Sequence, residues 1–131
     1  MSPMDPETES ALVQQLRRGD EAAFDTVYDA FNLRLYTFLL RLSRRHDVAE
    51  DLLEETWLRL VKHAHRLHAD TRLGAWLFTV ARNLHVSYVR SRLIEDTTRA
   101  LQHHVKQTIA PYKYPRAIEY LETLPRTATG K

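Results

Sequence analysis

The feature that most constrains the fold is a run of apolar residues spaced three and four apart between residues 24 and 42. This spacing predicts one helix of about six turns, with an apolar stripe that other elements must cover. Residues 8–95 contain no stretch that alternates with period two, so no strand is predicted to supply the cover. The stripe comprises Phe24, Val27, Tyr28, Phe31, Leu35, Phe38, Leu39 and Leu42.

Three further helical stripes are predicted to cover the first. One ends at Gly19, a typical helix-stop residue, and Asp20 is placed to cap the helix that follows. Another begins where Asp47 and Glu50 have the spacing of a capping box, and the last begins near Leu73. Together they predict an all-α fold, a small four-helix domain. Their inner faces are Leu12, Val13 and Leu16; Val48, Leu52, Leu53, Thr56, Trp57, Leu60 and Val61; and Trp76, Leu77, Val80, Ala81, Leu84 and Tyr88.

We place this domain at residues 9–98. The two ends of the chain differ from it in proline content and in the spacing of their apolar residues. Residues 1–8 carry two prolines and no periodicity, which predicts a disordered lead-in. Residues 99–131 form a tail too short for a core of its own. Within it, apolar residues spaced by four from Leu101 to Ile109 predict a short helix that Pro111 ends, and a short strand is predicted over residues 117–121.

Composition excludes several classes of function. The chain has no cysteine, which removes disulfides, thiolate zinc sites and cysteine nucleophiles. Its three glycines are isolated, so a glycine-rich phosphate loop is not expected. No apolar run approaches the roughly 18–20 residues that cross a bilayer, and the acidic start is unlike a secretion signal. We therefore expect a cytoplasmic protein with no cofactor and no membrane partner.

Charge is sorted along the chain, although the net charge is only +2. Residues 1–59 carry 12 acidic and seven basic side chains, whereas the remaining residues carry five acidic and 12 basic ones. This pattern predicts one surface for a basic or neutral partner and another for a polyanion. The outer face of the fourth helix is predicted to present four arginines, either solvated or in contact with phosphates: Arg72, Arg82, Arg90 and Arg92.

The third helix is predicted to expose a mainly acidic face at spacings of three and four residues. This face comprises Asp51, Glu54, Glu55 and Arg59. No nucleophile lies nearby in the pattern, so we expect no catalytic residues here. A protein-docking face and a simple solvated face both remain open.

Histidines gather in the polar connection between the third and fourth helices. His65 and His68 have a spacing that suits metal ligands, but His63 and the surrounding carboxylates do not match it. We therefore expect no metal site. Trp57 and Trp76 lie on apolar stripes, which favours core packing over stacking on nucleic-acid bases.

Three segments stand in the order and spacing of a known family: GDEAAFDTVYDAF, DVAEDLLEETWLRL and LGAWLFTVARNLHVSYVR. From about residue 12 to residue 95 the chain resembles region 2 of extracytoplasmic-function (ECF) sigma factors of bacterial RNA polymerase. The resemblance implies a helical domain that binds the clamp of the largest subunit of the polymerase core. It also implies recognition and melting of the promoter −10 element through the non-template strand. An anti-sigma factor is kept open as a further partner.

The resemblance also implies roles for the singled-out residues. Asp51, Glu54, Glu55 and Arg59 would meet the clamp, and the four arginines would contact DNA phosphates. The connection before the fourth helix would capture a flipped −10 base and carry sequence preference through His65, Arg66, His68 and Thr71. The second sigma domain, region 4, which reads the −35 element, is expected to be absent.

The tail resembles a different family. HVKQTIAPYKYPRAIEYLETLPRTATGK is similar to the C-terminal end of acyl-CoA ligases, which are adenylate-forming enzymes, and by that resemblance Lys131 occupies the place of a catalytic lysine. The large domain that would bind ATP is missing, so we expect no enzymatic activity. The alternatives are a fragment of such a ligase, or an adaptor that only occupies the polymerase clamp.

Overall fold

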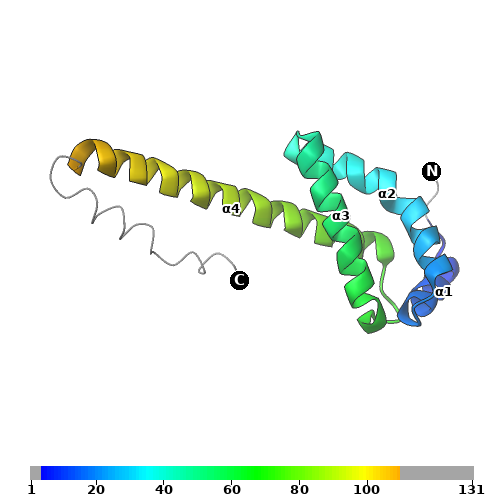
Figure 1. The fold of residues 1–131 in the computed structure, drawn as a ribbon. Coiled ribbons are helices and arrows are strands. Elements are labelled where there is room, and N and C mark those ends of the chain that lie inside the picture. The colour runs from blue at the N-terminus through cyan, green and yellow to red at the C-terminus, as the bar shows by residue number, and fades with distance from the viewer. Residues whose placement is uncertain (1–3, 110–131) are drawn as a thin grey trace. The chain divides into compact units, whose positions relative to one another are not determined.

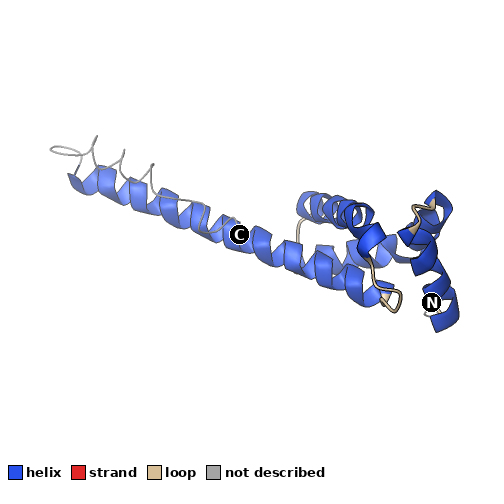
Figure 2. Cartoon of the chain, turned by 90° about the horizontal axis from the view of Figure 1, so that it is seen from below, coloured by secondary structure: helices blue, strands red, loops and turns tan. Residues whose placement is uncertain are grey.

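The structure, a computed structural model, describes residues 4–109, with side chains described through residue 106. Every regular element in this part of the chain is helical (Figures 1 and 2). The elements are α1 (Pro6–Arg17), α2 (Glu21–Ser43), α3 (His46–His63), a 3₁₀ turn η1 (Ala64–Arg66) and α4 (Leu73–Ile109). The predicted all-α fold with four helices is confirmed. The strand predicted over residues 117–121 lies outside the described residues.

The core forms around α2, which contributes three fully buried side chains: Val27, Leu35 and Leu39. Leu60 of α3 and Leu77 of α4 are also fully buried and belong to the same cluster. The apolar stripe of α2 is therefore covered by the other helices, as the periodicity predicts.

The start of α4 lies close to α2 at Gly74. A Cβ atom added to Gly74 would lie 3.3 Å from Cε1 of Phe31, which is tighter than an ordinary carbon contact. Phe38 and Phe78 meet edge to face farther along, with ring centroids 5.1 Å apart. Glycine in the first turn of α4 thus lets this helix begin against the Phe31 ring.

The apolar stripes are wider than the core that they build. Tyr28 and Leu42 are each 39% exposed and Val61 is 57% exposed, although the stripes assign all three to the interior. Periodicity identifies a face of about 100°, whereas burial requires a neighbour over each residue of that face. The assignment of these three residues to the core is therefore wrong.

The turn between α1 and α2 is formed as predicted. Gly19 adopts a left-handed conformation, with φ of 80°, and its N–H donates to the carbonyl of Leu16 at 3.0 Å. Such a residue ends a helix by satisfying a free carbonyl. Asp20 then caps α2 by accepting the N–H of Ala22 at 2.9 Å.

The starts of α1 and α3 differ from expectation. Asp5 caps α1 by accepting the N–H of Thr8 at 2.8 Å, so α1 begins inside the predicted lead-in. This hydrogen bond, and a second from the Thr8 hydroxyl, hold the pKa of Asp5 below its ordinary value. The capping box is wrong, because Arg45 occupies the N-cap of α3. Asp47 instead pairs with the Arg45 side chain at 2.8 Å, which lowers the pKa of Asp47.

The fourth helix is longer than predicted. It runs to Ile109, the last residue that the structure describes, and includes the residues predicted to form a separate short helix. The predicted stop at Pro111 lies outside the described residues. No proline or glycine interrupts it after Gly74. Ion pairs between Arg92 and Glu95 and between Asp96 and Arg99 follow its i, i+3 spacing. The contacts between residues divide the chain after His85, within this helix.

Two leucines of α2 test how far stability depends on this core. Leu35 is fully buried, whereas Leu33 is 73% exposed. Replacing Leu35 by Ala should lower the free energy of unfolding by about 2–5 kcal/mol, because it leaves a cavity. Leu33→Ala should change it by about 0.5 kcal/mol at most. Urea unfolding followed by circular dichroism measures both, and equal losses would contradict the assignment of the core.

Candidate functional site

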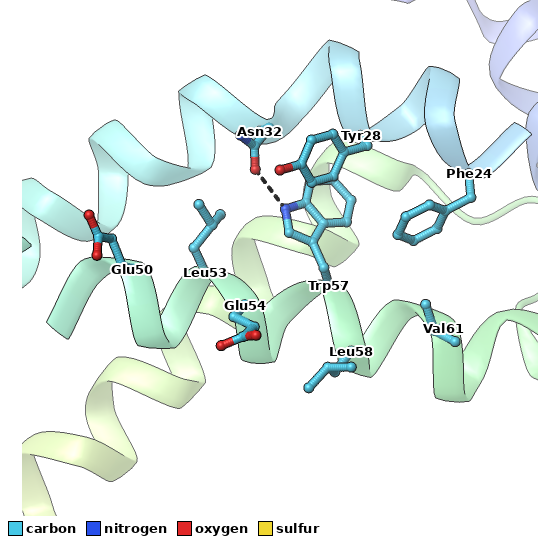
Figure 3. Close-up of a pocket in the computed structure, with 9 residues that line it drawn as sticks. All are labelled: Phe24, Tyr28, Asn32, Glu50, Leu53, Glu54, Trp57, Leu58 and Val61. Atoms are coloured by element: carbon cyan, nitrogen blue, oxygen red, sulfur yellow. Dashed lines mark hydrogen bonds between the residues drawn. The ribbon is translucent and has the colours of Figure 1, made fainter. Parts of the chain in front are cut away.

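A groove lies between α2 and α3. We call it the α2–α3 groove (Figure 3). It is open to solvent and has a volume of about 450 Å³. Its lining residues are Phe24, Tyr28, Asn32, Glu50, Leu53, Glu54, Trp57, Leu58 and Val61. The lining is mostly apolar, with carboxylates contributed by α3.

Trp57 joins the two sides of this groove. Its side chain extends from α3 toward α2, and its indole N–H donates to Oδ1 of Asn32 at 2.9 Å (Figure 3). The indole packs edge to face on Phe24, with ring centroids 5.8 Å apart, and lies 5.0 Å from the Tyr28 ring. Trp57 is 6% exposed, so its predicted place in the core is confirmed.

The outer part of the groove combines exposed apolar surface with acidic charge. Leu58 is 47% exposed and Val61 is 57% exposed, and Tyr28 is partly open. Glu50 and Glu54 are exposed on the same helix. Apolar side chains that water reaches, beside carboxylates, form a surface suited to an amphipathic partner with basic residues.

The sequence pattern did not indicate the apolar part of this surface. It assigned Tyr28 and Val61 to the core and gave Leu58 no role. One signal was present in the sequence: Leu58 is a large apolar residue between Glu54 and Arg59 on the predicted polar face. A single exposed leucine is common on protein surfaces. Together with the exposed Val61, however, Leu58 forms an apolar patch that water reaches.

The structure does not gather the four predicted docking residues into one cluster. Asp51 and Glu54 are exposed, and Glu54 lines the groove. Glu55 is half-buried and forms an ion pair with Arg59 at 3.1 Å. Arg59 projects about 140° around the helix from Glu54, since each residue advances by about 100°. Asp51 and Glu54 are therefore the members with open carboxylates near the groove.

The connection from α3 to α4 is anchored to the core by a buried leucine near each end. Leu67 is 6% exposed and Leu73 is fully buried, so both enter the core. Between them His68 is exposed, and its carbonyl accepts the N–H of Thr71 at 3.0 Å. The loop thus presents polar side chains between two fixed points. Of the predicted base-contacting residues, three are exposed and Thr71 is half-buried: His65, Arg66, His68 and Thr71.

The four predicted arginines are all exposed, but they do not share one face. Arg90 and Arg92 are two residues apart in α4, so they project about 200° from each other. Arg92 is also paired with Glu95 at 3.8 Å. Arg72, Arg82 and Arg90 have no ion-pair partner among the residues that the structure describes. These three guanidinium groups are open to an external anion.

The described residues form neither a metal site nor a helix that could span a membrane. Within residues 4–109, no three histidine or carboxylate side chains are arranged to hold a metal ion. His63 instead has its Nδ1 2.9 Å from the carbonyl of Arg59. None of the helices in the described part of the chain has an apolar stretch long enough to span a membrane.

Comparison with known proteins gives a match over the part of the chain that carries both surfaces. Residues 27–93 match the family described as Sigma-70 region 2. The ECF RNA polymerase sigma factor SigM of Bacillus subtilis (strain 168) is 38% identical over 73 residues. These residues are 56% of this chain and 44% of that relative, so the chain spans less than half of its length.

The C-terminal part of the chain matches a second family. Residues 74–131 match the AMP-binding enzyme C-terminal domain. Two mitochondrial acyl-coenzyme A synthetases, ACSM1 of Mus musculus and ACSM2A of Homo sapiens, are 57% and 60% identical over 37 residues. That stretch is 28% of this chain and 6% of each relative. No solved structure matches the chain.

Proposed function

The chain belongs to the sigma-70 region 2 family, and we propose that it acts in transcription initiation, where it binds the RNA polymerase core and recognises and opens the promoter −10 element. The observation that carries this proposal is that two chemically different surfaces lie almost entirely in the part of the chain that matches the family. One is the apolar, acidic α2–α3 groove. The other comprises the loop before α4 and the open arginines of α4.

The groove side of α3 is the proposed contact with the clamp of the largest polymerase subunit. Exposed Leu58 and Val61 would be removed from water by a helix laid along the groove, which favours association. Asp51 and Glu54 would pair with basic residues of that partner and orient it. Glu55 and Arg59 belong to the same proposed contact, although they already pair with each other.

The loop and α4 are the proposed contact with the non-template strand. Arginine side chains bind phosphates without regard to sequence, whereas contacts to base edges carry sequence preference. Arg72, Arg82 and Arg90 suit phosphate binding because their guanidinium groups are open, and Arg92 would first have to leave Glu95. The polar side chains of η1 and of the loop that follows it suit contacts to base edges, and they are His65, Arg66, His68 and Thr71.

We also propose that the chain has no enzymatic activity. The match to acyl-coenzyme A synthetases spans 6% of those relatives. Adenylate formation requires groups that bind ATP and an acyl substrate, and neither proposed surface supplies them. The rival candidates remain a ligase fragment and an adaptor that only occupies the polymerase clamp and does not open the promoter.

Charge reversal tests the polymerase contact. Asp51→Lys combined with Glu54→Lys should reduce binding to core RNA polymerase by about 100-fold or more, because like charges would then face each other across the contact. The loss is measured by copurification with core RNA polymerase and by titrating the polymerase over the chain bound to a sensor surface. The matched control is Asp29→Lys with Glu7→Lys, an equal change of charge at exposed positions outside the groove lining. Equal binding by both double variants would contradict the placement of this contact.

Salt dependence tests the DNA contact. Arg82→Ala should weaken binding to all single-stranded sequences alike and reduce the slope of log affinity against log salt by about 0.7. His68→Ala should instead change which sequences are preferred. Arg41→Ala, which removes an exposed arginine of α2, is the control for charge alone. Affinity that does not vary with salt would refute the arginine assignment, and core binding without DNA binding would favour the adaptor.

An assay of pyrophosphate release tests the enzyme alternative. With ATP and a panel of carboxylic acids, the chain should release no pyrophosphate above a blank without protein. An intact acyl-coenzyme A synthetase serves as the positive control. Turnover that is lost on Lys131→Ala would favour the ligase alternative and contradict our assignment.

A further inference from the structure

A carboxylate of α1 contacts the start of α4 across the fold. Oε2 of Glu9 accepts the backbone N–H of Leu73 at 2.6 Å, which joins residues 64 positions apart. Leu73 is the first residue of α4. Its N–H is among those that an α-helix leaves without an intrahelical acceptor, so the Glu9 carboxylate satisfies a group that the helix cannot satisfy itself.

The residues just before α4 are poorly suited to cap it. Arg72 directly precedes the helix, and its side chain has donors but no acceptor. The carbonyl of Arg72 accepts the N–H of Trp76 at 2.9 Å, which starts the helical ladder. A side-chain acceptor therefore comes from a distant helix. The negative charge of Glu9 is also favourable at the positive end of the α4 dipole.

A pocket lies beside this contact, between α1 and the last residues of the loop. It has a volume of about 400 Å³ and separates the start of α1 from residues 69–72. Its walls include Pro6 and Ser10 on one side and Asp70 and Thr71 on the other. Across this open space, the hydrogen bond between Glu9 and Leu73 gives the loop a defined attachment to α1.

We propose that Glu9 is a positioning residue that fixes the end of the loop, so that its side chains are held for sequence readout. The inference rests on the proposed function, because it concerns the loop assigned there to base contacts. Thr71 lies two residues before Leu73, and His68 is hydrogen-bonded to Thr71 through the backbone. A shift of the Leu73 N–H would therefore move both.

The charge of Glu9 separates this role from a direct contact with DNA. A carboxylate repels phosphates, so its removal would raise affinity for every sequence if charge alone mattered. A positioning role predicts a different result, in which discrimination between sequences falls. Glu9→Gln keeps an oxygen acceptor without the charge, and Glu9→Ala removes both.

The experiment compares the full chain with three variants by selection from a single-stranded DNA pool that has a short randomised stretch. Glu9→Ala should lower the enrichment of the preferred sequence by up to about tenfold, since the free energy of one charged hydrogen bond limits how much order the loop can lose. Glu9→Gln should recover most of it. Glu7→Ala removes a carboxylate of the same helix that has no such bond, and it should match the wild type. Hydrogen exchange of the Leu73 amide is measured in parallel.

Each result decides the proposal. Lower enrichment and faster Leu73 exchange in Glu9→Ala, both reversed by Glu9→Gln, support it. An unchanged sequence profile in Glu9→Ala overturns it. If the wild type enriches no sequence, the proposed function fails, and Leu73 exchange alone decides whether Glu9 holds the loop. An exchange rate that stays unchanged in Glu9→Ala then overturns the positioning role.

Discussion

Burial of the apolar stripe of α2 is the constraint on which the rest of the structure depends. Val27, Leu35 and Leu39 are fully buried, and the helix packs against α1, α3 and the start of α4. The ring of Phe31 lies against Gly74, where an added Cβ atom would make a tight contact of 3.3 Å with Cε1 of the ring. Because α2 contacts the other three helices, its stripe determines which face of α3 stays outside and where α4 begins. Both candidate surfaces follow from those two placements.

The groove between α2 and α3 exists because the apolar stripes of these two helices are wider than the area that the other helices cover. The stripe of α2 is wide enough to leave Tyr28 at its edge, and Val61 of α3 remains largely exposed on the other side. The buried Trp57 holds the two helices together through Asn32, so the groove has a fixed floor. A partner that covers the groove would complete the burial that the four helices leave unfinished.

Two family matches meet within α4. The region 2 match ends at residue 93 and the match to the AMP-binding enzyme C-terminal domain begins at residue 74, so both include residues 74–93. The helix runs through this overlap to Ile109 without proline or glycine after Gly74. The sequence between the predicted fourth helix and Leu101 therefore carries no helix-stop signal, so the prediction of a separate helix there had no local support.

The sequence by itself determined the four helices, their order, and the turn at Gly19 and Asp20, because periodicity and caps act over a few residues. Charge and motif order also indicated residues of both proposed surfaces, but not the apolar part of the α2–α3 groove. Only the tertiary structure decided that Val61 stays exposed, that Arg59 is paired with Glu55, and that Glu9 caps α4. These outcomes depend on which surfaces meet and on side-chain directions around a helix. A contact between residues 64 positions apart leaves no local pattern in the sequence.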